Sequence, residues 1–233
     1  MRFATPLCFG LIAAAALGCP AHSQDDPDQS LRRYAVHVVR VPKENWTGYG
    51  IYLGNGLVLT AAHVAGNKYW HTIRVQIAGQ ELPAEVLKEG EFSAVDAADV
   101  DLALVSIDDK QLPVSLRLRR MPICKQPPRP GEEVIVAIPE GIARSHVISP
   151  ALIPANINPK FRTAISDVAT TGNSGSGVFD ADMKCLLGII SAKISQPQIK
   201  LENGHPVRVT HDVAKYFVPA PIIAAFIPPE YHF

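Results

Sequence analysis

Three segments of the sequence carry residue types that could take part in nucleophilic catalysis. His63 follows two alanines at the end of an apolar run, Asp101 directly precedes another apolar run, and Ser174 stands among glycines in the segment Thr171–Gly177. An imidazole can take a proton from a hydroxyl, and a carboxylate can orient that imidazole. Glycines permit a tight turn that aims backbone N–H groups at one point, which is what a developing oxyanion needs. Together these residues could transfer an acyl group.

Each of the three segments, taken alone, also fits an ordinary structural role. A lone histidine is more often a surface or core residue, Asp101 could simply begin a strand at a turn, and a glycine- and serine-rich segment could be a flexible loop. Asp99 and Asp101 form at most a weak pair of ligands for a divalent metal, because no third ligand stands nearby. The sequence therefore predicts no metal site and no cofactor.

The glycine-rich segment departs from two other common motifs. It lacks the Lys-Ser/Thr ending of a phosphate-binding loop. It also fails the G-x-S-x-G pattern of the α/β-hydrolases. A pattern centred on Ser174 would need glycine at Ser176, and a pattern centred on Ser176 would need glycine at Ser174. The order of the three candidates along the chain is His, Asp, Ser, and each gap is long enough to hold several strands. Residues from different strands could therefore meet in one cleft.

The segments that would position these residues are predicted to be short strands. Asn-Gly pairs at 55–56 and 203–204 mark hairpin turns, and turn residues recur at intervals of about ten. This spacing predicts an all-β barrel or sandwich. One short helix is predicted at Ala220–Phe226, before Pro228 and Pro229. Strands are predicted at Tyr34–Val41, Gly50–Leu53, Leu57–Thr60, Thr72–Ile77, Leu102–Ile107, Glu133–Ile138, Val178–Phe179, Leu186–Ser191 and Val207–Thr210.

Composition excludes several classes of protein. The 233 residues contain 19% charged and 47% hydrophobic residues, which does not suit a disordered chain. The 22 basic and 22 acidic residues balance, whereas nucleic-acid binders concentrate Lys and Arg. We therefore expect a globular protein without a nucleic-acid partner.

The N-terminus resembles an export signal. Met1-Arg2 is followed by an uncharged stretch from Pro6 to Gly18, too short to span a membrane, and Ala21–Ser23 fits a cleavage site. We expect removal of residues 1–23 and a periplasmic or secreted protein with no transmembrane segment. The alternative is a lipoprotein with Cys19 lipidated.

The three segments and their order resemble the signature blocks of trypsin-like serine proteases of the chymotrypsin fold. The blocks are Leu59–His63, Asp101–Val105 and Gly172–Ser176, and Asn173 is similar to the HtrA-type and glutamyl-endopeptidase subgroups. Leu187–Ser191 and Tyr216–Pro219 resemble the strands that follow the nucleophile and precede the C-terminal helix. The resemblance implies two six-stranded antiparallel β-barrels with a short C-terminal helix. The segments would be a signal peptide at 1–23, an N-terminal extension at 24–33, an N-terminal barrel at 34–118, and a C-terminal barrel with its helix at 119–233.

The resemblance also implies roles for individual residues. Ser174 would be the nucleophile, His63 the general base and Asp101 its orienting carboxylate, with the N–H groups of Gly172 and Ser174 as the oxyanion hole. The reaction would be hydrolysis of peptide bonds through an acyl-enzyme. Asn173 cannot make the carboxylate pairing that activates trypsin zymogens, so we expect no such switch. The implied substrate-binding residues are Val168, Ala169, Thr170, Thr171, Ser191, Ala192 and Lys193.

The resemblance leaves the specificity, the assembly and part of the function open. No aspartate stands at the expected base of the pocket, and Ile190 replaces the histidine of glutamyl endopeptidases, so neither Arg/Lys nor strict Glu preference is expected. Cys124 and Cys185 would form a disulfide. The chain ends shortly after the barrel, so we expect no PDZ domain, and the oligomeric state stays open. The alternatives are a catalytically silent binding module, an esterase on the same fold, or a structural protein.

Overall fold

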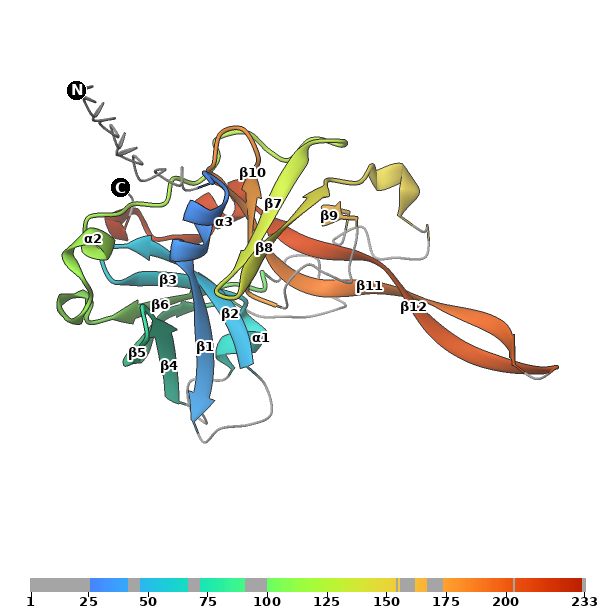
Figure 1. The fold of residues 1–233 in the computed structure, drawn as a ribbon, viewed down its shortest axis with the longest axis horizontal. Coiled ribbons are helices and arrows are strands. Elements are labelled where there is room, and N and C mark those ends of the chain that lie inside the picture. The colour runs from blue at the N-terminus through green and yellow to red at the C-terminus, as the bar shows by residue number, and fades with distance from the viewer. Residues whose placement is uncertain are drawn as a thin grey trace, which may run out of the picture.

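The computed structural model describes residues 26–41, 47–66, 72–90, 100–153, 155, 162–166, 174–202 and 204–231. Strands dominate this part of the chain, and they form two six-stranded antiparallel sheets with few helices (Figure 1). The expected all-β class, the two six-stranded antiparallel sheets and the short C-terminal helix are confirmed. No helix among the described residues is long and apolar enough to cross a membrane.

The first sheet closes into a barrel in the order β1-β2-β3-β6-β5-β4. Its inner core is a cluster of small and branched apolar side chains that includes Val36, Val58, Val75 and Val105. β-Branched residues suit such half-buried, pleated surfaces. The strands are β1 (Ala35–Val41), β2 (Thr47–Gly54), β3 (Leu57–Thr60), β4 (Thr72–Ile77), β5 (Gln80–Glu89) and β6 (Ala103–Ile107).

The second sheet has the order β8-β7-β10-β11-β12-β9. Its two outer strands meet just beyond β8, where Val147 bridges Ile165 and the Ile148 N–H donates to the Ala164 carbonyl at 2.9 Å. This contact closes the second ring. The strands are β7 (Glu133–Ile138), β8 (Gly141–His146), β9 (Ala164–Ile165), β10 (Gly177–Asp180), β11 (Leu186–Glu202) and β12 (His205–Pro219).

The two barrels share one apolar interface. Its buried cluster joins Ile51 and Leu59 of the first barrel to Phe179 and Ile189 of the second. Short helical elements connect and cover the sheets, and the C-terminal helix begins and ends where the sequence predicts. They are η1 (Gln29–Tyr34), α1 (Ala62–Ala65), η2 (Asp109–Gln111), α2 (Val114–Arg117), η3 (Pro150–Leu152), α3 (Ala220–Phe226) and η5 (Pro229–Tyr231).

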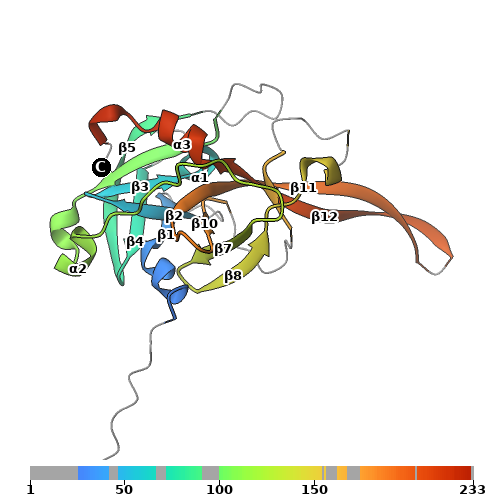
Figure 2. The same cartoon turned by 90° about the horizontal axis from the view of Figure 1, so that it is seen from above.

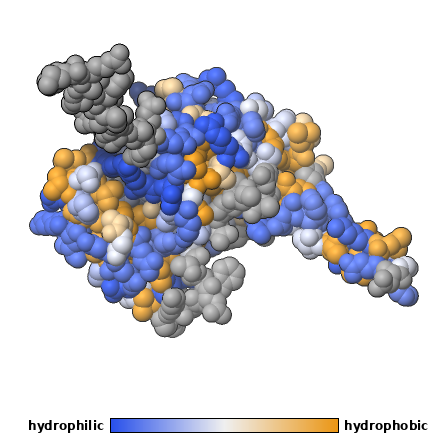
Figure 3. Space-filling view, in the orientation of Figure 1, coloured by the Kyte–Doolittle hydropathy of each residue, from blue (hydrophilic) through white to orange (hydrophobic). Residues whose placement is uncertain are grey.

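The last hairpin is far longer than the sequence predicts. Its two strands have 17 and 15 residues, and their outer part projects from the body of the molecule (Figures 1 and 2). We call the outer part, Gln196–Glu202 paired with His205–His211, the arm. Hydrophobic residues gather at its far end (Figure 3), where Ile199 and Leu201 are about three-quarters exposed.

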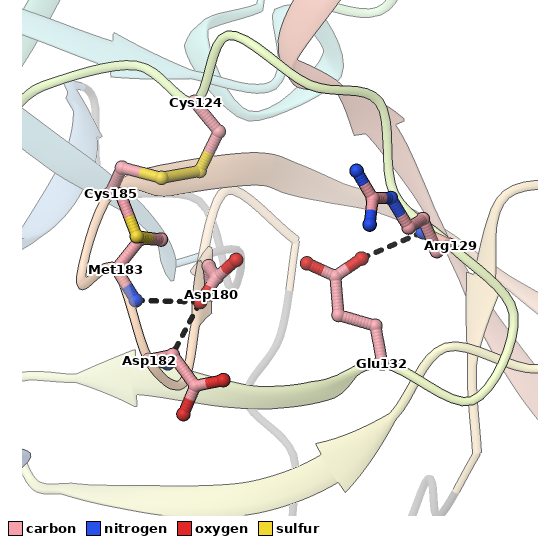
Figure 4. Close-up of a disulfide and its surroundings, with 7 residues drawn as sticks. All are labelled: Cys124, Arg129, Glu132, Asp180, Asp182, Met183 and Cys185. Carbon is pink, nitrogen blue, oxygen red and sulfur yellow. Dashed lines mark hydrogen bonds between the residues drawn. A yellow bond between two sulfur atoms is a disulfide. The ribbon is translucent and has the colours of Figure 1, made fainter.

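A disulfide joins Cys124 to Cys185, the pair that the resemblance implies. Figure 4 shows that it ties the segment before β7 to the turn between β10 and β11. Asp180 shapes this turn, because its carboxylate accepts the N–H groups of Asp182 and Met183 at 2.8 and 2.7 Å. The disulfide therefore fixes the start of the strand that leads to Ser191.

The segment expected to be an N-terminal extension packs on the second barrel. Asp28 is buried and binds both Arg144 and Lys184, with 2.6 Å between its Oδ1 and the Lys184 Nζ. Leu31 enters the interface cluster, and Arg32 donates to the Pro139 carbonyl. This polar and apolar contact fixes the entry of the chain into β1.

Candidate active site

Strand pairing brings His63 and Asp101 together. β3 and β6 are antiparallel neighbours, and Thr60 at the end of β3 lies opposite Ala103 at the start of β6. Residues that follow β3 and residues that precede β6 therefore lie at the same end of the barrel. His63 stands on α1, just after β3, and Asp101 stands two residues before Ala103.

The Asp101 carboxylate binds His63 twice. Its Oδ1 accepts the backbone N–H of His63 at 3.0 Å, and its Oδ2 lies 2.8 Å from the imidazole Nδ1. The Asp101 side chain is fully buried, whereas the His63 side chain is 31% exposed. A buried carboxylate needs such hydrogen bonds to offset its desolvation. The arrangement fixes both the position of the histidine backbone and the orientation of its ring.

This contact also determines which ring nitrogen carries the proton. A carboxylate accepts hydrogen bonds and has none to donate, so Nδ1 carries the proton in the Asp101 contact. In the neutral imidazole the other nitrogen, Nε2, is then the proton acceptor. Because the ring is partly exposed, it can act as a general base at the surface of the molecule.

The turn that bears Ser174 is held between the two barrels. The Tyr49 N–H of β2 donates to the Ser174 carbonyl at 3.0 Å, and the Gly175 N–H donates to the Ile190 carbonyl of β11 at 2.8 Å. Gly175 has a φ of +89°, and a Cβ there would lie 1.8 Å from the Tyr49 carbonyl oxygen. Only glycine fits this position. The turn therefore needs its glycine to bring the serine against the first barrel.

Ser191 connects the serine to the aspartate. Its carbonyl oxygen accepts a hydrogen bond from the Ser174 Oγ at 3.2 Å, and its own hydroxyl donates to the Asp101 Oδ2. Asp101 thus accepts three hydrogen bonds in all from His63 and Ser191. The residues that sequence reasoning selected from three distant segments are linked through one residue of β11.

Tyr216 adds a buried phenol on the neighbouring strand. Burial, and to a smaller extent the charge of Asp101, raises the pKa of Tyr216 to about 12. The phenol therefore stays protonated throughout the physiological pH range. The sequence predicts Tyr216 only as part of a strand, and nothing in its spacing from Asp101 indicates that the charge of Asp101 acts on its phenol.

The other expected site residues divide into two groups. The oxyanion residue Gly172 and the pocket residues Val168, Ala169, Thr170 and Thr171 lie outside the described residues. Ser191, Ala192 and Lys193 lie on β11, and of these Ser191 accepts a hydrogen bond from Ser174.

Two of these β11 residues have side chains that contact aspartates of the same chain. The hydroxyl of Ser191 donates to Asp101, and its carbonyl is the group directed at Ser174. The Lys193 Nζ lies 2.9 Å from the Asp212 carboxylate of β12. In the described part of the chain, no cluster of three or more His, Cys, Asp or Glu residues could hold a metal ion. Asp99, the second member of the weak pair considered above, lies outside the described residues.

Comparisons with known proteins agree with this geometry. Residues 48–189 match the family of trypsin-like peptidase domains. No curated protein matches the chain.

Three solved structures illustrate the shared fold. The active form of the Rv3671c protease of M. tuberculosis has 16% identity and a TM-score of 0.54, covering 97% of this chain and 92% of that one. The scabies mite inactivated protease paralogue S-I1 has 16% identity and a TM-score of 0.56, covering 84% and 92%. Mouse neuropsin, a serine protease, has 13% identity and a TM-score of 0.54, covering 83% and 92%.

At these identities the structural likeness shows the fold alone, and it includes a protease described as inactivated. The family match covers well over half of the chain. The chain belongs to the family of trypsin-like peptidase domains and is, by that membership, a hydrolase of the serine endopeptidase class.

Proposed function

We propose that the protein cleaves peptide bonds with Ser174 as nucleophile, His63 as general base and Asp101 as the residue that orients His63. The observation that carries this proposal is the double contact of Asp101 with His63, which leaves the Nε2 as proton acceptor. The link from Ser174 through Ser191 to Asp101 supports it, because it joins the nucleophile to the same buried carboxylate.

The proposed reaction proceeds in two balanced halves. The Ser174 Oγ forms a bond to the substrate carbonyl carbon while its proton passes to the His63 Nε2. The carbon–nitrogen bond then breaks, and His63 returns the proton to the leaving amine, which leaves an ester on Ser174. Water repeats the sequence on that ester and releases the acid. The Gly172 and Ser174 N–H groups are the proposed oxyanion donors.

The hydroxyl proton of Ser174 must change partner before this reaction starts. The hydroxyl donates to the Ser191 carbonyl, and a hydroxyl has a single proton to give. Redirecting this proton towards His63 would release that carbonyl. A peptide N–H from the substrate could then donate to the freed Ser191 carbonyl.

A fluorophosphonate probe tests the nucleophile directly. The protein should react covalently and lose peptidase activity, whereas Ser174→Ala should neither react nor cleave a casein substrate. Ser115→Ala is the matched control, because it changes an exposed serine on α2 and should keep both the labelling and the activity. Equal labelling of the Ser174→Ala variant would contradict the assignment. A correctly folded wild-type chain that does not react would identify a silent binding module.

Export is also part of the proposal. Residues 1–23 would be a cleaved signal, followed by an extension at 24–33 and the two barrel units at 34–118 and 119–233. The disulfide between Cys124 and Cys185 supports an oxidising compartment, since such bonds seldom persist in the cytosol. A mature chain that begins at Gln24, found outside the cytoplasm, is the expected result of N-terminal sequencing.

A further inference from the structure

β11 continues far beyond the candidate site, and one of its edges is unpaired within the part of the chain that the structure describes. Its strand partners are β10, up to Ile189, and β12 on the other side. From Ser191 to Glu202 the edge that faces away from β12 has no strand partner among the described residues. This edge begins at the residue whose carbonyl binds the Ser174 hydroxyl. A free strand edge is a ready template for another extended chain.

The backbone groups of this edge can be assigned by position. Along a strand, the N–H and C=O groups of alternate residues point to opposite sides. The Ser191 carbonyl points away from β12, towards Ser174. Pro197 has no N–H to give to a ladder, so it also faces the free edge. Both positions are odd-numbered. The register shift at Ile190/Ala192 precedes this stretch, and the shift at Ile194/Ser195 inserts a residue on β12, so the alternation along β11 continues. The edge therefore presents the backbone of Lys193, Ser195, Ile199 and Leu201 as well.

The same residues share one face of the arm, and its outer part is apolar. Ile199 lies opposite Arg208 across the hairpin, and Leu201 lies opposite Pro206. Ile199 and Leu201 are 76% and 75% exposed. A shallow hollow of about 380 Å³ is lined by Pro197, Gln198 and Ile199 of β11 and by Pro206 and Arg208 of β12. Exposed apolar side chains gathered on one face indicate a binding surface.

We propose that the arm binds the N-terminal side of an extended polypeptide substrate as an added antiparallel strand, reaching well beyond the residues next to the scissile bond. This inference rests on the proposed function. The substrate class would be unfolded or extended chains with apolar residues at alternate positions, and folded loops would gain nothing from the arm.

The direction of the edge supports this occupant. β11 runs away from Ser174, so a strand antiparallel to it runs towards Ser174 and delivers its carbonyl end to the nucleophile. If the residue that carries the scissile carbonyl lies beside Ser191, every second residue before it meets the next odd position of β11. The ninth residue then lies beside Ile199 and the eleventh beside Leu201. A substrate whose scissile bond lies at Ser174 would continue directly along this edge, because the edge begins at Ser191.

A length series of peptides tests the proposal. Substrates share one cleavable core and carry four, eight or twelve residues before the scissile bond, with valine at the ninth and eleventh positions in the longest. For the intact protein we expect kcat/KM to rise roughly tenfold or more with length, since each added hydrogen bond favours binding by about two- to tenfold. In an arm-deleted variant, with residues 199–208 replaced by Asn-Gly, the rise should disappear while cleavage of the shortest peptide stays unchanged.

Methylation of single peptide nitrogens gives a sharper readout. The ninth residue should direct its N–H at the arm, whereas the tenth directs its N–H away. N-methylation at the ninth should therefore lower kcat/KM by roughly three- to tenfold, and N-methylation at the tenth should not. Ile199→Asp should reduce the gain for the longest peptide. Val207→Asp, on the opposite face of the same arm, should leave it intact.

The outcomes separate this proposal from the proposed function. Cleavage of the shortest peptide with no dependence on length would overturn the role of the arm and leave the catalytic assignment standing. Failure to cleave any peptide would overturn the catalytic assignment and the role of the arm with it.

If length has no effect but deletion of the arm converts a sedimenting dimer to a monomer, the arm is a contact between copies. If length has no effect but deletion abolishes binding to phosphatidylglycerol vesicles, it is a membrane contact. Either result overturns the substrate role.

Discussion

The two barrels hold their parts of the candidate site in different ways. The first barrel supplies His63 and Asp101 from the ends of two paired strands, and one buried carboxylate fixes both backbone and ring. The second supplies Ser174 from a tight turn that is bound to β2 on one side and to β11 on the other. His63 is thus oriented mainly within one barrel, with Ser191 of the other barrel donating to Asp101, whereas the placement of Ser174 depends on how the two barrels pack.

The barrels also differ in what holds them closed. In the first barrel each strand has two strand neighbours in the ring. The second closes through a single bridge at Val147, and it carries the disulfide and the buried Asp28 contacts in addition. We infer that changes at His63 and Asp101 act mainly on the chemistry, whereas changes at the disulfide and at Asp28 act mainly on stability.

The largest expected effect is chemical and lies in the first barrel. Asp101→Asn should lower kcat/KM by about 10⁴-fold, because the amide can donate where the carboxylate accepts, and this favours the wrong imidazole tautomer. Peptide hydrolysis and the rate of fluorophosphonate labelling should fall together. The pKa of Tyr216, which burial and secondarily the Asp101 charge raise to about 12, should decrease yet stay above the usual value near 10.

Glu85→Gln is a suitable control for this substitution. Glu85 is an exposed carboxylate on β5 of the same barrel, so its removal changes charge without touching the candidate site. The control should keep full activity and the unfolding temperature of the parent, and Asp101→Asn should stay folded at the temperature of the assay. Wild-type labelling rates in Asp101→Asn would contradict the orienting role.

The sequence predicted the parts of the fold that local patterns determine. Apolar runs bounded by turns predicted β3, β4 and β7 with correct ends, and the prolines after Phe226 marked the end of α3. β5 and β8 were missed because polar and charged side chains, and Pro83 within β5, hide their pairing from a single-sequence pattern. Tertiary context formed these strands.

The candidate site was predictable only where order along the chain carried information. His63, Asp101 and Ser174 were selected from their types and order, and the structure brings the first two into contact. Ser191 is predicted to bind substrate, but its sequence position gives no sign that its hydroxyl donates to Asp101, a contact between residues 90 positions apart. The sequence predicts the last hairpin as two short strands, Leu186–Ser191 and Val207–Thr210, because the exposed, mixed sequence of Pro197–Glu202 lacks the apolar pattern of a buried strand.

The next effect is on the stability of the second barrel. Replacing Cys124 and Cys185 together by serine should lower the free energy of unfolding by about 2–4 kcal/mol, because the bond links residues 61 apart and restricts the unfolded chain. Urea unfolding at neutral pH measures the change. Activity well below the unfolding transition should persist, since neither cysteine contacts His63, Asp101 or Ser174.

Met183→Ser serves as the control for the disulfide. Met183 lies in the same turn with its side chain 75% exposed, so its replacement should change stability by less than about 0.5 kcal/mol. Loss of activity from the double serine variant, at a temperature where it stays folded, would show that the disulfide also positions the nucleophile. That result would contradict a purely stabilising role.

The smallest expected effect concerns Asp28 and depends on pH. Burial opposes ionisation of this carboxyl, but the hydrogen bonds and charges of Lys184 and Arg144 outweigh it, so the pKa of Asp28 is lowered. Asp28→Asn should lower the free energy of unfolding by about 1–2 kcal/mol at pH 7. Lys184 and Arg144 remain partly exposed and can turn to water, which keeps the loss below that of a fully buried ion pair.

The lowered pKa of Asp28 fixes the direction of the pH effect. The stability that the ionised carboxylate contributes is complete above its unfolded pKa, near 4, and is lost as pH falls from there through the folded pKa. The difference between Asp28→Asn and the parent in urea unfolding should therefore be constant from pH 7 to 5 and shrink below pH 4. Asp182→Asn, an exposed carboxylate of the β10–β11 turn, should show no such difference. A gap that stays constant down to pH 3 would mean that Asp28 stabilises the second barrel through packing, and its pairing with Lys184 and Arg144 would then contribute little.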